Sequence, residues 1–299
     1  LHALWAIGYD VYLSNPETEQ TRRALAALDL LVVQDMFLTE TARELAHVFL
    51  PAAGSFEKDG TFMNSERRIQ RVRRAIDPPE GARPDWEILC DTARALARPG
   101  FDFGSAEEIW EEIRSVWPAG RGIRYERLER GGIQWPCPDE DHPGTEVLHG
   151  TEFAHGPRAK LQCVTPLPSQ EVPSADYPFL LVTGRDLYQF NAGTMTMRTP
   201  HALLRPEDVL ELCPDDAERL GLSDGDRVRI ESRHGEVELP IAIRQRMRAG
   251  QVFATFHTAA AFVNRLTGTA LDPRSHTPEY KRTAVRLSRT GLAERTRQS

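Results

Sequence analysis

The feature that most constrains the fold is a strand-like segment at residues 28–35 (LDLLVVQD) with four successive apolar residues at its centre, which lies between apolar runs at residues 2–8 and 47–53. Successive apolar positions are typical of a parallel sheet covered on both faces, because a strand with one wet face alternates. A helix with Pro16 at its first position is predicted between the first two runs, and a short helix capped by Thr39 between the last two. This alternation predicts a doubly wound α/β sheet, whose ligands lie beyond the carboxyl ends of its strands.

Short strands dominate the last part of the chain. Apolar strands are predicted at residues 178–184 and 209–214, followed by a short helix (PDDAERLG). A hairpin over residues 228–243 turns at His234-Gly235, and residues 250–257 form a further strand. Many short strands with one small helix indicate a compact β-barrel.

Helices are also predicted at residues 85–98 and 105–117, the second of which opens with the capping box SAEE. Residues 131–176 are rich in Gly, Pro and His and lack periodicity, and we interpret them as an ordered linker that wraps the molecule. Its expected anchors are Trp135, Leu148 and Phe153. The expected domains are a partial α/β domain at residues 1–130, the linker at 131–176 and the barrel domain at 177–299.

Charge and cysteine usage exclude several classes of protein. A formal net charge of −7 argues against nucleic acid as a partner, and no apolar stretch approaches the roughly 18 residues of a membrane helix. The four scattered cysteines lack the paired spacing of zinc or iron–sulfur sites and are compatible with the cytoplasm. Residues 66–74 (ERRIQRVRR) concentrate arginine, a pattern that suits a small anionic ligand but also allows a solvated strand edge.

A series of longer motifs carries a family resemblance. In chain order these are LVVQDMFLTETA with HVFLPAA, EKDGTFMNSERRIQ, RPDWEI, GIQWPCP, TGRDLYQFNAGTMT and NRLTGTALDPRSHTPEYK. With these motifs the chain resembles the molybdopterin oxidoreductases of the dimethyl sulfoxide reductase type, and the formate dehydrogenases among them. The resemblance implies a bis-molybdopterin guanine dinucleotide cofactor with molybdenum or tungsten. It also implies that the barrel at residues 177–299 is a double-psi β-barrel.

The resemblance further implies which residues contact this cofactor. In the α/β domain they are Gln34, Asp35, Lys58 and Asp85. In the barrel domain they are Thr183, Gly184, Arg185, Gln189, Asn191, Thr194, Thr196, Phe256, Asn264 and Lys281. These residue types suit the ligand, because a carboxylate can accept two bonds from a guanine edge and a cation neutralises phosphate. The residues alone leave structural alternatives open, with Asp85 as a helix N-cap and Phe256 as core.

One departure from the family pattern concerns the first loop. The family usually has GxNP there, whereas this chain has Gly8-Tyr9-Asp10-Val11, and a carboxylate repels phosphate. We therefore assign no cofactor contact to Asp10. Cys137, in the motif WPCP and close to His142, is interpreted as part of a structural loop rather than a metal site.

No catalytic residue or metal ligand is assigned, because the family's metal-ligating cysteine or selenocysteine and its 4Fe-4S motif match no position of this chain. Both are expected in a region before Leu1, which opens directly on an apolar run and favours a fragment of a longer subunit. The expected activity is oxidation of formate to carbon dioxide, with electrons passed to an electron-transfer subunit. The alternatives are a nitrate reductase catalytic subunit of the same family and a noncatalytic, truncated scaffold paralogue.

Overall fold

The computed structural model describes residues 1–290, and the chain forms two compact units. The barrel unit comprises Leu1–Phe49 and residues 167–290, and the middle unit comprises Leu50–Pro166. The first sheet thus groups with the barrel, whereas the sequence predicts one domain over residues 1–130. The domain boundaries at 130 and 176 stay a prediction.

The first sheet of the barrel unit is small, and its first two strands are parallel. Its strand order is β1 (Ala3–Ile7), β2 (Leu30–Asp35) and β3 (Val48–Pro51), and β1 pairs with β2 in parallel, with Ala3 opposite Leu30. Helix α3 (Glu40–Glu44) begins as predicted, because the Thr39 hydroxyl accepts a bond from the backbone N–H of Ala42.

The predicted helix start at Pro16 is wrong. A short helix, α1 (Val11–Ser14), forms before it, because the Asp10 carboxylate accepts a hydrogen bond from the backbone N–H of Leu13 at 3.4 Å. The next helix, α2 (Thr18–Ala26), begins after Glu17, whose φ of 45° is left-handed. Pro16 therefore lies between two helices, and the sequence prediction missed the N-cap role of Asp10.

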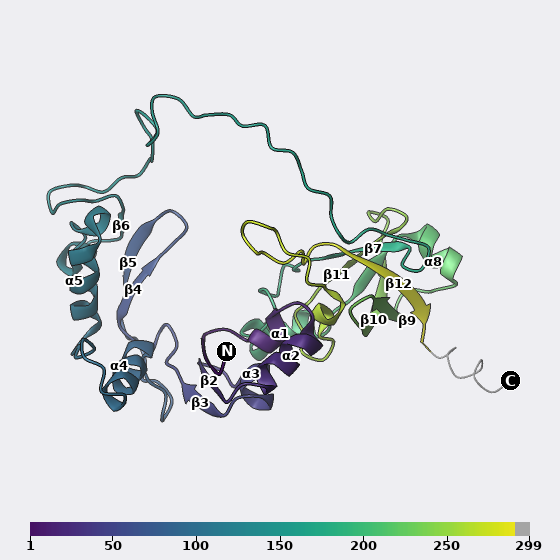
Figure 1. Ribbon diagram of the computed structural model, residues 1–299, viewed down its shortest axis with the longest axis horizontal. Helices are drawn as coiled ribbons and strands as arrows, with labels where there is room; N and C mark the ends of the chain where they lie inside the picture. The colour runs from purple at the N-terminus through teal and green to yellow at the C-terminus, as the bar shows by residue number, and fades with distance from the viewer. Residues whose placement is uncertain (291–299) are drawn as a thin grey trace. The chain divides into compact units, whose positions relative to one another are not determined.

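A closed β-barrel forms the larger part of the barrel unit (Figure 1). Its strands follow the spatial order β10-β8-β11-β7-β12-β9. Their bounds are Phe179–Thr183 for β7, Leu210–Leu212 for β8, Arg227–Ser232 for β9, Glu236–Ile243 for β10, Gln251–Ala254 for β11 and Thr283–Arg289 for β12. The barrel mixes parallel and antiparallel pairs, since β7 pairs in parallel with β11 and antiparallel with β12.

Alternating side chains of these strands fill the barrel. Phe179 and Leu181 of β7 pack with Val228 and Ile230 of β9, and each is at most 1% exposed. Burial of such a side chain stabilises the fold by about 1.5–3 kcal/mol. Helix α8 (Pro214–Leu220) covers part of this core and ends at Gly221 in a left-handed conformation. The predicted barrel, its hairpin and its small helix are confirmed.

The middle unit combines an antiparallel sheet with helices. The sheet has the order β4 (Gly60–Met63), β5 (Arg68–Val72) and β6 (Ile133–Gln134). The predicted helices are present as α4 (Asp85–Ala95) and α5 (Ala106–Val116). They are followed by η1 (Pro118–Gly120) and α6 (Tyr125–Leu128). Trp110 and Ile123 lie in the buried core of this unit.

The predicted capping box of α5 is only half formed. Ser105 Oγ accepts a bond from the N–H of Glu108 at 3.2 Å, but the Glu108 carboxylate accepts from Gly104 rather than from Ser105.

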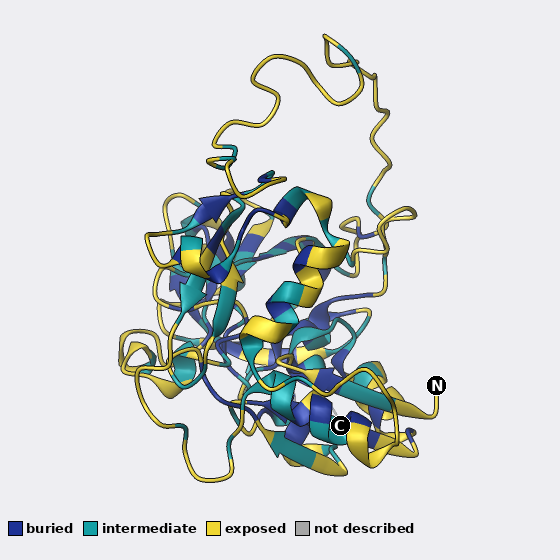
Figure 2. Cartoon of the chain, turned by 90° about the vertical axis from the view of Figure 1, so that its left-hand side faces the viewer, coloured by how far each residue is buried: buried dark blue, intermediate teal, exposed yellow. Residues whose placement is uncertain are grey.

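Of the expected linker anchors, Trp135 packs edge-on against Trp117, whereas Leu148 and Phe153 are 38% and 41% exposed. Residues 147–168 are almost all exposed (Figure 2). No helix among residues 1–290 has the length and apolar character to cross a membrane.

Candidate functional site

A cavity of about 270 Å³ lies in the barrel unit, between loops of the first sheet and loops of the barrel. Its lining consists of Tyr9, Ser14, Thr183, Asn191, Ala192, Phe256, Asn264, Tyr280 and Lys281. Five of these residues are predicted cofactor contacts: Thr183, Asn191, Phe256, Asn264 and Lys281. The fold thus brings together residues from Tyr9 to Lys281, and of the predicted contacts Thr183 and Lys281 lie 98 positions apart in the sequence.

Lys281 supplies a cation to this cavity. Its Nζ donates to the backbone carbonyl of Thr183 at 3.1 Å and lies 5.1 Å from the centre of the Phe256 ring. Burial and then the positive charge of Arg185 lower the pKa of Lys281 from its ordinary value. An anion in the cavity would restore the preference for the charged ammonium.

Tyr280 and Asn264 tie the barrel loops to the first sheet. The Tyr280 hydroxyl donates to the Ser14 carbonyl at 3.2 Å, and burial followed by the nearby Tyr9 raises the pKa of Tyr280 to about 12. Asn264 lies in the short helix η3 (Val263–Leu266), and its Nδ2 donates to the carbonyls of Leu13 and Ser14, each at 3.1 Å. These bonds fix the wall of the cavity.

The loop at residues 184–196 follows β7 and approaches the barrel closely at its two glycines. A Cβ on Gly184 would lie 2.4 Å from the Phe253 ring. A Cβ on Gly193, whose φ is 73°, would lie 2.2 Å from the carbonyl oxygen of His257. Larger residues are excluded at both positions.

Polar contacts inside this loop hold its predicted residues. Thr196 Oγ1 accepts from the N–H of Phe190 at 3.2 Å, and the carbonyl of Thr194 accepts from Arg198 Nη1 at 2.6 Å. Arg185 is exposed, with its guanidinium 5.4 Å from the centre of the Phe190 ring. Its fork of donors is therefore presented to solvent rather than used in the core.

Gln189, Gln34 and Asp35 do not line the cavity. Gln189 is 4% exposed, and its Nε2 donates to the carbonyls of His201 and Arg205 at 3.2 and 3.1 Å. Gln34 and Asp35 end β2 and are buried, as expected for the carboxyl end of a parallel strand. Asp35 Oδ1 accepts from the N–H of Phe37 at 3.1 Å, and burial raises the pKa of the Asp35 carboxyl.

Lys58 and Asp85 lie together in the middle unit. Lys58 Nζ is 2.5 Å from Asp85 Oδ2, and both residues line a second cavity, of about 220 Å³. The N-cap of α4 is Pro84, without a side-chain cap bond, so the alternative role of Asp85 as an N-cap is wrong. Because the ammonium and the carboxylate are paired with each other, a ligand at this cavity would compete with their ion pair.

The arginine cluster at residues 66–74 belongs to the structure of the middle unit. Arg67 donates to the carbonyls of Thr145 and Glu146, and Arg71 pairs with Glu129 at 3.2 Å while its guanidinium lies 3.8 Å over the Tyr125 ring. These contacts engage the charges of Arg67 and Arg71, which favours a structural role of the cluster over an anion site.

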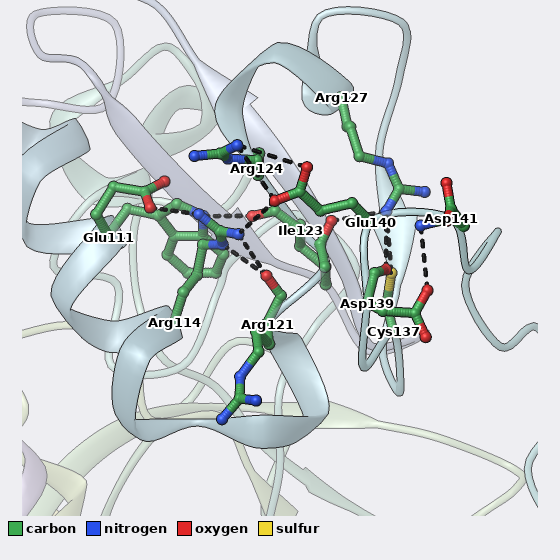
Figure 3. Close-up of polar contacts among 12 residues, drawn as sticks. Glu111, Arg114, Arg121, Ile123, Arg124, Arg127, Cys137, Asp139, Glu140 and Asp141 are labelled. Atoms are coloured by element: carbon green, nitrogen blue, oxygen red, sulfur yellow. Dashed lines mark hydrogen bonds and ion pairs between the residues drawn. The ribbon is translucent and has the colours of Figure 1, made fainter.

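Cys137 lies buried in a hydrogen-bonded loop (Figure 3). Arg127 Nη1 donates to the Gly122 carbonyl at 2.6 Å and lies 3.4 Å from Cys137 Sγ, and Arg127 Nη2 donates to the His142 carbonyl at 2.7 Å. These contacts match the interpretation of WPCP as a structural loop. Across the described part of the chain, no group of three or more His, Cys, Asp or Glu side chains is placed to hold a metal ion.

Asp10 has a structural role that the sequence did not reveal. It is 4% exposed, and its carboxylate accepts from the N–H groups of Leu13, Glu40 and Thr41 and from the Thr41 hydroxyl. The carboxylate therefore joins the N-termini of α1 and α3. Tyr9 and Ser14, on either side of it, line the cavity and had no sequence signal beyond their place in the first loop.

Comparison with protein families gives two matches. The model "Molybdopterin oxidoreductase" matches residues 1–95, and the model "Molydopterin dinucleotide binding domain" matches residues 179–284. The chain belongs to the molybdopterin oxidoreductase family. Within this family, the chain is similar to proteins named as formate dehydrogenases and nitrate reductases.

The F420-dependent formate dehydrogenase subunit alpha of Methanocaldococcus jannaschii is 44% identical over 96% of this molybdopterin oxidoreductase chain. The assimilatory nitrate reductase catalytic subunit of Bacillus subtilis is 38% identical over 92% of it. The chain spans only 43% and 40% of these two relatives. Among solved structures, acetylene hydratase from Pelobacter acetylenicus matches with a TM-score of 0.73 and 16% identity, covering 96% of this chain and 44% of that chain, which shows a shared fold.

The cavity of this molybdopterin oxidoreductase chain fits part of a phosphorylated pterin. Lys281 offers a cation, the side chains of Thr183, Asn191 and Asn264 offer hydrogen-bonding groups, and Phe256 offers an aromatic face. A pterin presents both donors and acceptors on a flat ring, so amide and aromatic groups suit it. A cavity of about 270 Å³ accommodates one portion of such a ligand rather than a whole dinucleotide.

Proposed function

We propose that this chain holds a bis-molybdopterin guanine dinucleotide cofactor for a formate dehydrogenase that oxidises formate to carbon dioxide. The observation that carries the proposal is the cavity at which Thr183, Asn191, Phe256, Asn264 and Lys281 meet. When bound, the cofactor with its molybdenum or tungsten supplies the two-electron redox chemistry. The residues of this chain bind the cofactor and set the charge around it.

Each group in the cavity has a separate task. Lys281 neutralises a phosphate, and Asn264, held by the carbonyls of Leu13 and Ser14, positions the polar wall against the pterin. Arg185, exposed beside Phe190, extends the cationic surface toward the pyrophosphate. In the middle unit, Asp85 recognises the guanine edge and Lys58 the phosphate. Gln34 and Asp35, at the end of β2, and Gln189, Thr194 and Thr196, in the loop at residues 184–196, are proposed as further cofactor contacts.

The family supports a finer description of the fold and the holoenzyme. We propose that the closed barrel is a double-psi barrel and that the sheet of β1, β2 and β3 is part of a doubly wound domain. An electron-transfer subunit would be the partner. A 4Fe-4S cluster would be bound by a region of the catalytic subunit other than residues 1–299. All four cysteines have free thiols rather than disulfide bonds (Cys90, Cys137, Cys163 and Cys213), which supports a cytoplasmic location.

We expect the variant Lys281→Met to weaken cofactor binding about ten- to a hundredfold, because a charge-assisted bond to phosphate is lost. Molybdenum or tungsten and released guanine nucleotide per purified chain would be measured. Lys160→Met, at an exposed position of the linker, is the matched control. Full loading of Lys281→Met would remove Lys281 from the site.

Substrate assays separate formate dehydrogenase from the alternatives. The loaded holoenzyme that contains this chain should reduce a viologen dye with formate and should not oxidise reduced viologen with nitrate. The reverse pattern would identify a nitrate reductase, for which the 38% identity to the Bacillus subtilis enzyme is the supporting observation. A folded protein that carries neither metal nor guanine nucleotide would indicate a noncatalytic scaffold.

A further inference from the structure

A buried histidine lies directly behind the loop at residues 184–196. His257 follows strand β11, is 2% exposed, and belongs to none of the predicted cofactor contacts. Its Nε2 lies 3.2 Å from the carbonyl oxygen of Arg205, and its Nδ1 lies 2.9 Å from Asp208 Oδ1. The Nδ1 contact is an ion pair outside hydrogen-bond geometry, whereas Nε2 lies within hydrogen-bond distance of a carbonyl oxygen, which can only accept.

This arrangement favours the doubly protonated ring. A positive ring charge is stabilised by the Asp208 carboxylate 2.9 Å from Nδ1, while Nε2–H donates to the Arg205 carbonyl. Burial lowers the pKa of His257, but contact with Asp208 and the charge of Asp186 outweigh it, so the pKa is raised. Burial raises the pKa of Asp208, but the bonds from His257 and Thr258 outweigh it, so that pKa is lowered.

Two contacts connect the loop at residues 184–196 to His257. The carbonyl of Arg205 accepts from the ring of His257 and also from Gln189 Nε2, so the loop and the histidine share one acceptor. Gly193 approaches the backbone of His257 so closely that a Cβ there would lie 2.2 Å from its carbonyl oxygen. Displacement of the ring would therefore act on Gln189 through the shared acceptor, whereas Gly193 depends on the position of the His257 backbone.

Other charged groups around His257 are largely paired with one another. His257 lies at a cavity of about 470 Å³ whose titratable and charged lining groups are Arg185, Asp186, Tyr188, Arg205, Glu207, Glu211, Arg244 and Arg246. Asp186 pairs with Arg205 at 2.9 Å, and Glu211 pairs with Arg246 at 2.6 Å. Asp208 is the carboxylate in contact with the ring.

We propose that His257, held doubly protonated by Asp208, is a positioning residue that fixes residues 184–196 in the conformation that faces the cofactor cavity. The proposal rests on the proposed function of that cavity. Because the pKa of His257 is raised in the fold, its stabilising contribution is complete below the unfolded value of about 6.5 and is lost as pH rises through the folded pKa. The contribution of Asp208, whose pKa is lowered, is present above about 3.9 and is lost at lower pH.

Hydrogen exchange of the cofactor-free chain tests this proposal without any activity assay. The amides of Phe190, Gly193 and Met197 are hydrogen-bonded within the loop and report its opening. We expect their protection, corrected for intrinsic exchange, to fall about tenfold as His257 loses its proton in an NMR titration. The protection of amides in the β9–β10 hairpin should stay constant over the same pH range.

Two variants complete the experiment. Asp208→Asn removes the charge that holds the ring protonated, so it should lower loop protection already at low pH and flatten its pH dependence. His276→Asn, at an exposed position of another loop, is the control and should behave as the wild-type chain does. Constant loop protection across the titration of His257, or unchanged protection in folded Asp208→Asn, would overturn the proposal.

The outcome is separable from the test of cofactor binding. A pH-dependent loop in a protein that never carries guanine nucleotide would refute the proposed function and, with it, the role of His257 toward a cofactor. A pH-independent loop in a protein that loads normally would refute only the role of His257.

Discussion

Replacing Asp10 with alanine is expected to lower the free energy of unfolding of the barrel unit by about 3 kcal/mol or more. The Asp10 carboxylate is 4% exposed and accepts from Leu13, Glu40 and Thr41, with the Thr41 hydroxyl at 2.6 Å. Alanine would leave these buried donors without an acceptor and would remove the N-cap of α1. Urea unfolding would measure the loss of free energy of unfolding, and hydrogen exchange of the β1 and β2 amides would locate it.

Asp10→Asn tests which property of the carboxylate matters. Asparagine keeps one acceptor oxygen but turns an amide N–H₂ toward further donors, so we expect a loss intermediate between those of wild type and alanine. Asp29→Ala is the control, because the Asp29 side chain is 75% exposed and its ion-pair partner, His2, is exposed as well. If Asp10→Ala unfolds within about 0.5 kcal/mol of wild type, the network does not stabilise this fold.

The second large effect is expected for Gly122→Ala in the middle unit. An added Cβ would lie 1.8 Å from the backbone oxygen of Asp139, and that segment cannot withdraw freely because the Gly122 N–H donates to the Cys137 carbonyl at 2.8 Å. Arg127 ties the same two segments together (Figure 3). Overpacking against backbone should destabilise the unit by about 3 kcal/mol.

Tryptophan fluorescence is a suitable measurement, because Trp110, Trp117 and Trp135 lie in one cluster of this unit. Gly150→Ala is the matched control, since the nearest atom to its added Cβ is 3.9 Å away. Equal urea midpoints for the two alanine variants would show that the loop from Gly122 to Asp139 tolerates a shift that the structure does not suggest.

The sequence predicts those elements whose signal is local. Thr39 caps α3, the alternation over residues 228–243 forms a hairpin, and the apolar run at residues 28–35 forms a strand. Strand β12 is absent from the prediction because Arg286 and Arg289 interrupt its apolar pattern, and its place is set by pairing with β7 and β9. Such long-range pairing leaves little trace in a short stretch of sequence.

The residues of the candidate site were predictable only through family motifs, and only in part. The cavity gathers Thr183, Asn264 and Lys281, which no local pattern connects. The charge of Asp10 is unsuited to a phosphate site, yet its carboxylate serves the helix N-termini beside the cavity, where backbone N–H groups favour negative charge. His257 gave no signal, because its importance arises from Asp208, 49 positions earlier in the chain.

The place of β12 in the barrel constrains how the protein can fold during synthesis. This strand lies between β7 and β9, so the ring cannot close until residues 283–289 have left the ribosome. The middle unit, continuous over Leu50–Pro166, meets no such restriction. Its core can therefore form while β7 and β9 still await their neighbour, and their open edges at that stage are a target for chaperones.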